Sequence, residues 1–509
     1  MTRPSHPPPQ AAESDLPEGW FQTAVDQLLA SLESGSRPRG GVRGISEGKP
    51  SIGGEHLNDE GGFRFDNIKY VPEPFYRGML RGRIQVGDVL VVKDGATTGK
   101  VSLVRPEFPY PEAVVNEHVF VCRPAAGVVP AFLFWYLFSK EGQVRILENF
   151  QGSAQGGINQ SFAPGTSVPV APSTEQKRIV AKVEELLGRV NAARGRLAKA
   201  PAILKRFRQS VLAAACSGRL TEDWRRNHLD ENAEHLLASV QSKAMRKCEV
   251  DYEIPESWAA APCGSLCRCD RALTYGVIKL GPPHESGVPT LRSSDVRSLC
   301  IDESSIKRIS PEIAAQYNRT FLEGGEIVVT VRGTLGGVAL VPPHMKGYNV
   351  SREVAVIPVH PTLNAAFFAS AIASIRSQNW LTDVEKGVAY TGINIEDLKR
   401  LPLPVPPLAE QREIVRLVEK LFALADAIER RVSAATARAE RLTQAILAKA
   451  FRGELVPTEA EIARAEGRAY ESAAELLVRI RSSTEGPSTS PRTTRSGRRN
   501  PARTRRRIQ

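Results

Sequence analysis

The stretch Glu175-Gln-Lys-Arg-Ile-Val180 returns as Glu410-Gln-Arg-Glu-Ile-Val415, 235 residues further along the chain. Other landmarks repeat at the same offset or at 238: Gly157-Ile158-Asn159 with Gly392-Ile393-Asn394, Val168–Pro172 with Leu403–Pro407, Gln209–Leu220 with Gln444–Leu455, and Leu16–Trp20 with Ile254–Trp258. Between these landmarks the two copies diverge. The sequence therefore predicts a duplicated unit with a constant frame and variable contents, which suits the presentation of two different binding surfaces.

Length and composition place the chain among ordinary globular proteins. Its 509 residues can form two domains with connecting structure, and 41% of them are apolar. No stretch approaches the ~20 apolar residues of a membrane helix, and residues 1–15 lack the apolar core of a secretory signal. Seven irregularly spaced cysteines favour a reducing compartment over a disulfide framework. We therefore expect a cytoplasmic protein with a disordered leader over 1–15.

The net charge of +12 is concentrated at the C-terminus. After Glu485 there are eight arginines and no acidic residue, so the rest of the chain carries only about +4. A polybasic arm of this kind either contacts a phosphate backbone or remains a solvated terminus. Both interpretations stay open, and we expect a basic disordered tail over 482–509.

Each copy predicts an α+β domain followed by a long helix. In the first copy, strand signals occur at 87–93, 101–104 and 119–121, and a helix is expected around 131–147. The second copy repeats the first two strand signals. The expected divisions are domains at 16–172 and 251–407, long helices at 173–216 and 408–450, a connector at 217–250 and a helical C-terminal segment at 451–481.

The two long helices carry apolar residues at alternating steps of three and four, a pattern typical of coiled coils. The residues of this helix seam include Ile179, Val183, Leu186, Val190 and Leu197 in the first helix, and Ile414, Val418, Leu421, Ile428 and Val432 in the second. A stripe of this length needs an apolar partner, and pairing within the chain is the simplest solution. Periodicity alone leaves parallel and antiparallel pairing open. Pro201 is expected to kink or break the first helix.

Known catalytic and metal-binding patterns are absent or incomplete. Gly95–Lys100 resembles a phosphate-binding loop, but it is one residue short and precedes a strand, so we interpret it as a β-turn. Cys263, Cys267 and Cys269 are irregularly spaced, and His284 is only a loose fourth ligand for zinc. We therefore expect no catalytic site, no metal and no cofactor bound by this chain.

The order of these motifs, doubled at constant spacing, resembles the specificity (S) subunit of type I restriction–modification systems over residues 16 to about 480. The resemblance implies two target-recognition domains, each reading one half of a split DNA sequence, and an antiparallel coiled coil that spaces them. It implies no catalysis by the chain itself. It further implies two docked methyltransferase (M) subunits and recruited restriction (R) subunits, which would bind S-adenosylmethionine, Mg and ATP. The N-terminal leader and the Arg-rich tail would be additions to the family pattern.

Sequence reading of double-stranded DNA requires polar and basic side chains on loops. The candidates in the first domain are Arg37, Arg39, Arg43, Lys49, Lys93, Thr97, Thr98 and Lys100. Those in the second are Thr274, Tyr275, Lys279, Arg292, Ser293, Ser294, Arg332 and Thr334. Any one of them could instead be a solvated loop residue. Asn159 and Asn394 recur in both copies, which favours a role in capping or turn formation over base reading.

Two alternatives remain. The chain could be a scaffold that presents two protein-interaction domains on a coiled coil without touching DNA. It could also be part of a fused methyltransferase–specificity protein, although the complete double repeat argues against this. Nucleic-acid binding measured against salt concentration would separate a DNA reader from a scaffold.

Overall fold

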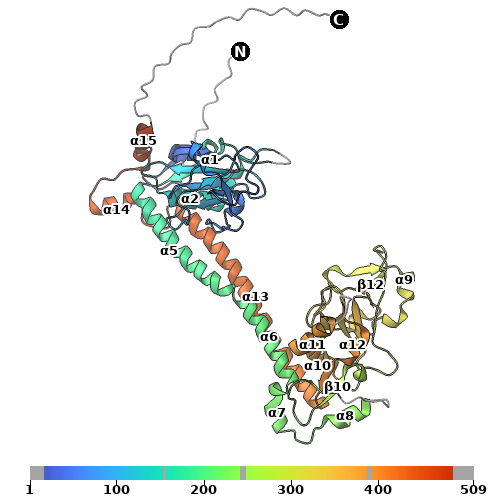
Figure 1. The fold of residues 1–509 in the computed structure, drawn as a ribbon. Coiled ribbons are helices and arrows are strands. Elements are labelled where there is room, and N and C mark those ends of the chain that lie inside the picture. The colour runs from blue at the N-terminus through green and yellow to red at the C-terminus, as the bar shows by residue number, and fades with distance from the viewer. Residues whose placement is uncertain (1–15, 153–155, 241–247, 387–391, 485–509) are drawn as a thin grey trace, which may run out of the picture. The chain divides into compact units, whose positions relative to one another are not determined.

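The computed structural model describes residues 16–152, 156–240, 248–386 and 392–484. The described chain forms two compact units (Figure 1). Unit 1 falls within Met1–Gly195 and Thr436–Gln509, and unit 2 within Arg196–Ala435. Both units mix short strands with helices and include part of the long helices, which confirms the expected α+β class with long helices. The expected leader, and the tail from residue 485 onward, lie outside the described residues.

The described residues of unit 1 form three small β-sheets. The largest is antiparallel, in the order β2 (Leu29–Ser34), β8 (Val119–Pro124), β5 (Val89–Val92) and β6 (Val101–Leu103). The second has the order β4 (Lys69–Val71), β3 (Lys49–Ile52) and β7 (Val114–Val115), and the third pairs β1 (Phe21–Ala24) with β9 (Ser167–Val170). The four residues of β5 are all valine or leucine and all buried, as expected for a strand covered on both faces.

Unit 2 repeats this arrangement of three sheets. The largest has the order β11 (Thr274–Tyr275), β17 (Val354–Ile357), β14 (Ile327–Thr330) and β15 (Val338–Leu340). The other two are β13 (Lys307–Ile309), β12 (Val288–Leu291) and β16 (Asn349–Val350), and the pair β10 (Ala259–Pro262) with β18 (Pro402–Val405). The strand signals that recur in the sequence therefore form the same hairpin in both units, β5–β6 and β14–β15.

The helices of the two units also correspond. In unit 1 they are α1 (Glu73–Gly78), α2 (Pro130–Phe138), α3 (Lys140–Leu147) and α4 (Phe162–Gly165). In unit 2 they are α9 (Pro311–Ala315), α10 (Ala365–Ala373), α11 (Ile375–Lys386) and α12 (Ile395–Arg400).

The single helix expected over 131–147 is wrong, because Ser139 adopts an extended backbone and divides it into α2 and α3. The Ser139 hydroxyl caps α3 by accepting a hydrogen bond from the Gly142 N–H at 3.1 Å.

The first long helix is divided and the second is continuous. Helix α5 (Ser173–Leu197) ends two residues before α6 (Ala200–Cys216), and Pro201 lies in the first turn of α6, where its missing N–H costs no helical hydrogen bond. Helix α13 (Leu408–Phe451) runs without interruption. The break expected at Pro201 is thus present, just ahead of the proline itself.

The long helices pair in an antiparallel manner within each unit. In unit 1, Ile179 and Val183 at the start of α5 share a core with Leu447 at the end of α13. In unit 2, Arg208 of α6 contacts Asp426 and Glu429, whereas Arg225, beyond the end of α6, contacts Glu410 at the start of α13. The residue order of the contacts fixes the direction that periodicity left open.

The expected helix seam is buried only near the helix ends. Ile179, Val183, Val190, Ile414 and Val418 are buried. Toward the middle, Leu186, Leu197, Leu421 and Val432 are only partly buried, and Ile428 is 38% exposed, so the stripe is not buried over its whole length. Small alanine side chains occupy much of α13 there and provide little apolar surface to cover these residues. Leu187, which the heptad pattern assigned outside the stripe, is buried instead.

The repeated Glu-Gln dipeptide holds each unit together from inside. The indole of Trp20 donates a hydrogen bond to Glu175 at 2.8 Å, and Trp258 donates one to Glu410 at 2.7 Å. The adjacent Gln176 accepts from the N–H of Val129, ahead of α2, and donates to the carbonyl oxygen of Ala171. Gln411 makes the same two bonds, at the same distances, with Asn364 and Pro406. We call these two Trp-Glu-Gln sets the frame residues.

The repeated Gly-Ile-Asn segments also have a structural role. The Asn159 side chain accepts from the Ser161 N–H at 2.8 Å, and the Asn394 side chain caps α12 by accepting from the Asp397 N–H at 2.8 Å. The prediction that these asparagines form turns and caps is confirmed.

Short helices follow each long helix. They are α7 (Glu222–Arg226) and α8 (Ala233–Val240) in unit 2, and α14 (Glu459–Glu466) and α15 (Ala473–Thr484) in unit 1. Helix α8 lies in the expected connector, and α14 and α15 lie largely in the expected helical C-terminal segment. Within the described residues, no helix combines the length and the apolar character needed to cross a membrane.

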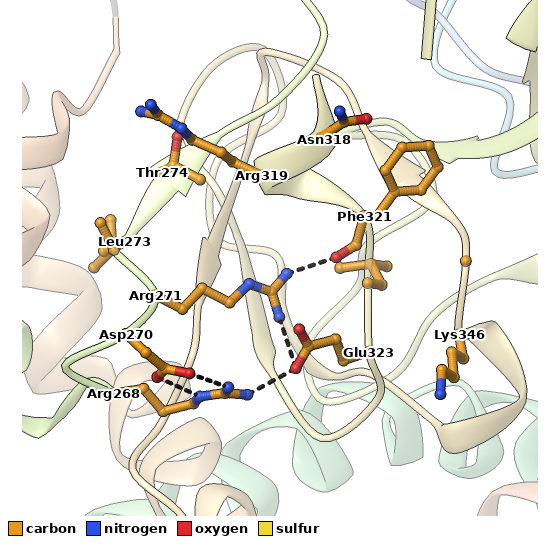
Figure 2. A pocket seen from close by; sticks show the side chains of 13 residues that line it. Arg268, Asp270, Arg271, Leu273, Thr274, Asn318, Arg319, Phe321, Glu323 and Lys346 are labelled. Carbon is orange, nitrogen blue, oxygen red and sulfur yellow. Dashed lines mark hydrogen bonds and ion pairs between the residues drawn. The ribbon is translucent and has the colours of Figure 1, made fainter. Parts of the chain in front are cut away.

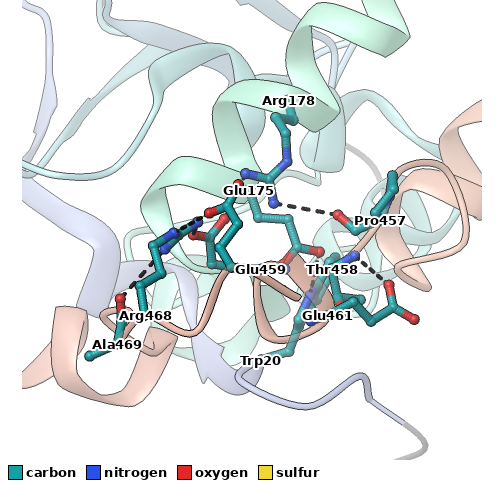
Figure 3. A network of polar contacts seen from close by, with 10 residues as sticks. Trp20, Glu175, Arg178, Pro457, Thr458, Glu459, Glu461, Arg468 and Ala469 are labelled. Atoms are coloured by element: carbon teal, nitrogen blue, oxygen red, sulfur yellow. Dashed lines mark hydrogen bonds and ion pairs between the residues drawn. The ribbon is translucent and has the colours of Figure 1, made fainter. Parts of the chain in front are cut away.

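Helix α14 is fastened to unit 1 by a buried carboxylate (Figure 3). Glu459 forms ion pairs with Arg178 at 2.6 Å and with Arg468 at 2.7 Å. Its backbone N–H donates to the second oxygen of Glu175 at 2.8 Å. Burial raises the pKa of Glu175, even though the N–H groups of Glu459 and Trp20 favour its charged form. The C-terminal segment therefore completes the core of unit 1 that begins at Trp20.

Candidate nucleic-acid interface

The tip of the repeated hairpin is held identically in both units. In unit 1, Lys93 accepts a hydrogen bond from the Ile158 N–H and donates its own N–H to His118, both at 2.8 Å. In unit 2, Val331 makes the same pair of bonds with Ile393 and Glu353, again at 2.8 Å. The turns that these bonds anchor, 93–100 and 331–337, carry the residues that differ between the copies. The fold therefore presents variable side chains from a fixed support.

Three arginines of unit 1 lie exposed on the glycine-rich loop between β2 and β3. Arg39 and Arg43 are exposed, and Arg37 forms an ion pair with Glu117 at 2.7 Å. Gly40, Gly41 and Gly44 of this loop have positive φ angles and open space around them. These features fit a loop that can approach a phosphate backbone.

Lys49 was expected on that loop, but the structure places it in a strand. It is the first residue of β3, where it contacts Glu112 and lies 3.4 Å from Glu73, and its ammonium sits 5.6 Å from the centre of the Tyr76 ring. The hydrogen bond to Glu112 raises the pKa of Lys49. With two carboxylate partners, Lys49 supports the structure of the loop base and has little unpaired charge to offer DNA.

The β5–β6 turn lines a polar cavity of about 370 Å³ in unit 1. Thr97, Thr98 and Lys100 contribute to its wall together with Asn58, Asp59 and Gln143. Lys100 forms an ion pair with Asp59 at 2.6 Å, which holds the pKa of that carboxyl below its usual value. Lys93 lies behind the turn and donates to the carbonyl oxygen of Glu117 at 3.3 Å. The expected β-turn over 95–100 is confirmed, and its polar atoms partly satisfy one another.

The unit 2 candidates divide into inward and outward groups. Arg292 binds Asp295 through two nitrogens at 2.9 and 3.1 Å, and Ser293 is buried with its hydroxyl donated to Glu353 at 2.7 Å. These two side chains, which we expected as DNA-contact candidates, are therefore engaged in contacts within the loop region. Ser294 is exposed beside them, and its hydroxyl donates to Asp295.

The outward group gathers around the second hairpin turn. Tyr275 on β11 is 40% exposed, and the Arg332 guanidinium lies 5.9 Å from the centre of its ring. Lys279 and Thr334 are exposed, and Thr274 is partly exposed. Arg332, which is partly buried, and the exposed Tyr275 and Thr334 thus belong to the accessible polar candidates of this unit.

Sequence reasoning missed a basic pocket in unit 2 (Figure 2). This cavity of about 780 Å³ includes Thr274 and four cations: Arg268, Arg271, Arg319 and Lys346. Arg268 and Arg271 both turn toward Glu323, at 2.7 and 3.5 Å, whereas Arg319 and Lys346 are exposed. The cations come from three segments that are 27 or more residues apart, so no local sequence pattern predicts the pocket.

The part of the chain that the structure describes contains no cluster of typical metal ligands. There, no three His, Cys, Asp or Glu side chains gather closely enough to hold a metal ion. Cys263 and Cys267 are buried, whereas Cys269 is exposed. The observed chemistry is that of hydrogen bonding and ion pairing, as in recognition of a polar polymer.

Comparisons with known proteins agree with this geometry. A family model for the type I restriction modification DNA specificity domain matches residues 284–435. The EcoBI specificity subunit of Escherichia coli is 39% identical over 294 residues, which cover 57% of this chain and 58% of that protein. The EcoDI specificity subunit of the same organism is 32% identical over 341 residues, or 67% of this chain and 73% of that protein.

A solved structure has a similar fold. A chain from a type I restriction–modification system, solved to explain complex assembly and conformational transition, superposes with a TM-score of 0.62. The match covers 86% of this chain and 99% of that chain, at 20% identity. This likeness supports the fold assignment.

Proposed function

This chain belongs to the family of type I restriction–modification DNA specificity subunits, and from that premise we propose that each of its two units reads one half of a bipartite target in double-stranded DNA. The subunit supplies sequence specificity and is not itself the enzyme. The relatives favour this function over a scaffold without DNA contact.

One observation carries the proposal. The two units share the same frame residues and the same hydrogen bonds at the hairpin tip, yet their turns present different side chains. A shared support with different contacts suits the recognition of two different base sequences in the same manner. We propose Arg37, Arg39, Arg43, Lys93, Thr97, Thr98 and Lys100 in unit 1 as DNA contacts, and Thr274, Tyr275, Lys279, Ser294, Arg332 and Thr334 in unit 2.

Partner subunits complete the proposed complex. Two methyltransferase subunits would dock on the long helices, restriction subunits would join them, and S-adenosylmethionine, Mg and ATP would bind to these partners. Exposed apolar side chains support docking on the helices: Ile203 and Leu424 of unit 2 are 62% and 54% exposed, and Leu442 of unit 1 is 48% exposed. A cytoplasmic location is part of the proposal, and the seven free cysteines support it.

Methylation sequencing of the source cells tests the function. Deletion of the gene should abolish adenine methylation at one motif made of two short sequences separated by unspecified bases. Complementation with the Leu424→Glu variant should fail to restore methylation if the exposed apolar residues dock a methyltransferase subunit. Glu419→Gln, a change at an exposed polar position of the same helix, provides the matched control. An unchanged methylome after gene deletion would contradict the proposed function.

A further inference from the structure

Asp94 of unit 1 and Arg332 of unit 2 occupy equivalent positions. Because β5 and β14 align residue for residue, Asp94 of unit 1 corresponds to Arg332 of unit 2. Each immediately follows the hairpin-tip residue whose backbone is bonded on both sides, Lys93 or Val331. The backbone at this position is therefore fixed by the frame, and only the side chain differs.

A glycine packs against this position in both units. A Cβ atom on Gly157 would lie 2.8 Å from the Cβ of Asp94, and one on Gly392 would lie 2.9 Å from the Cγ of Arg332. Both distances are shorter than atoms tolerate, so the repeated glycine allows the turn to approach the segment behind it. The side chain at position 94 or 332 is thus supported from behind, as base reading requires.

Arg332 is partly exposed, and its guanidinium lies beside an aromatic ring. The group lies over the Tyr275 ring, and no ion pair joins it to a carboxylate among the residues that the structure describes. The nearby Glu353 carboxylate accepts from Ser293 instead. Stacking on an aromatic ring limits the orientations of the planar guanidinium while leaving its N–H donors available. A pre-oriented arginine suits the paired acceptors N7 and O6 of guanine in the major groove.

Asp94 presents the opposite chemistry. It accepts from, or shares a proton with, His118 at 2.5 Å, and His118 corresponds by strand register to Glu353 of unit 2. The two corresponding positions are therefore aspartate and histidine in unit 1, which contact each other, and arginine and glutamate in unit 2, between which the described structure has no ion pair. The remaining lone pairs of the Asp94 carboxylate can accept a hydrogen bond from an exocyclic amino group, such as that on C4 of cytosine.

We propose that this equivalent position is a base-reading position, at which Arg332 selects a guanine in one half-site and Asp94 selects a cytosine in the other. The proposal rests on the proposed function, because it assumes that the units bind DNA. It adds the identity of one contacted base in each half-site and assigns it to one side chain. Neither the histidine–aspartate pair nor the correspondence of Asp94 with Arg332 was part of the candidate set drawn from the sequence.

The test uses the full chain and duplexes that carry the motif found by methylation sequencing, with each base pair substituted in turn. The wild-type chain should lose about 5- to 150-fold in affinity when one particular G·C pair of the unit 2 half-site is replaced. Arg332→Ala should bind the parent duplex more weakly by a similar factor and become indifferent at that base pair alone. Its preference within the unit 1 half-site should remain unchanged.

Two further variants sharpen the comparison. Asp94→Asn exchanges one acceptor for a donor at nearly constant shape, so it should lose its preference at one C·G pair of the unit 1 half-site. Lys346→Ala removes an exposed cation elsewhere in unit 2 and should weaken binding to all duplexes equally, with a smaller salt dependence. Thermal unfolding of each variant should match that of the wild type.

Different results test the base-reading position and the proposed function. If Arg332→Ala behaves like Lys346→Ala, the arginine contacts phosphate and the inference is overturned. Retention of full base discrimination by Arg332→Ala or by Asp94→Asn also overturns it. If the wild-type chain shows no preference among the duplexes, the proposed function itself fails.

Discussion

Trp258 donates the hydrogen of its indole nitrogen to the buried carboxylate of Glu410 at 2.7 Å. The same carboxylate accepts from Thr221 at 2.7 Å and from Arg225. It joins the start of the second domain, the segment that follows α6 and the start of α13, three segments far apart in the sequence. One side chain therefore links the binding domain of unit 2 to both of its long helices.

Removal of this link should destabilise unit 2. Glu410→Ala leaves Arg225, Trp258 and Thr221 without their partner, and we expect a loss of about 3–5 kcal/mol in the free energy of unfolding. Glu413→Ala is the control on the same helix, because the exposed ion pair of Glu413 with Arg416 should contribute only about 0–1 kcal/mol. Urea unfolding followed by tryptophan fluorescence measures both, and equal effects would contradict a central role for Glu410.

Unit 1 should show a pH dependence that originates at Glu175. Burial raises the pKa of Glu175 in the folded protein above its ordinary value of 4.5, so the folded state binds this proton more tightly than the unfolded state. The contribution of Glu175 to stability is therefore fully present at low pH and is lost as the pH rises through the folded pKa. Glu175→Gln cannot titrate and should abolish this part of the slope.

The control for that experiment has the opposite sign. The pKa of Glu454 is held below its ordinary value by a hydrogen bond from Arg452, so its contribution is lost as the pH falls. Unfolding free energies of wild type, Glu175→Gln and Glu454→Gln, measured at intervals from pH 4 to pH 8, distinguish the two residues. A wild-type advantage over Glu175→Gln that grows with pH would contradict the assignment.

Truncation of the C-terminal segment should unfold or loosen unit 1. Deletion of residues 457–509 removes Leu476, Leu477 and Ile480, which are buried in the core that contains Trp20. Each such side chain contributes about 1.5–3 kcal/mol when fully buried. Deletion of residues 486–509 alone should leave the midpoint of thermal unfolding unchanged and provides the control. Equal melting of the two truncated chains would show that α14 and α15 are dispensable.

The long helices should set the length of the unspecified spacer in the target. Seven residues inserted after Gly195 and seven after Ala435 lengthen each helical path by about 10 Å, which corresponds to about three base pairs. We expect the methylated motif to gain two to four base pairs between its halves. Two-residue insertions at the same points rotate the apolar faces apart and should abolish assembly. Methylation at an unchanged spacing by the seven-residue variant would contradict this role.

The sequence predicted the parts of the fold that depend on local pattern. The strands β5 and β14, the continuous helix α13 and the break before Pro201 follow from alternation, periodicity and the missing proline N–H. The break at Ser139 was missed because the apolar run Phe132–Leu137 suggested one continuous helix. Ser139 follows this run and caps a new helix instead. The partial exposure of the middle of the long helices depends on how much surface a partner covers, which periodicity does not report.

Site residues were predicted less well, because their roles depend on distant partners. The sequence around Ser293 is typical of an exposed loop. In the structure the Ser293 side chain is buried, and its hydroxyl donates a hydrogen bond to Glu353, 60 positions further on. Arg271 of the basic pocket likewise forms an ion pair with Glu326, 55 residues away. Asp94 could have been found by aligning the two hairpins, since the strand before it repeats. Its pairing with His118, in contrast, becomes visible only when β5 and β8 are placed side by side.

The frame residues have a consequence for how new specificities arise. Trp20 stands at the start of the first variable region and Glu175 just after its end, and Trp258 and Glu410 bracket the second in the same way. A genetic crossover within the repeated flanking sequences would exchange everything between these bonded pairs and restore each bond with an equivalent partner. One recombination event would thus change the recognised bases, and the exchanged domain would keep the hydrogen bonds that stabilise the fold.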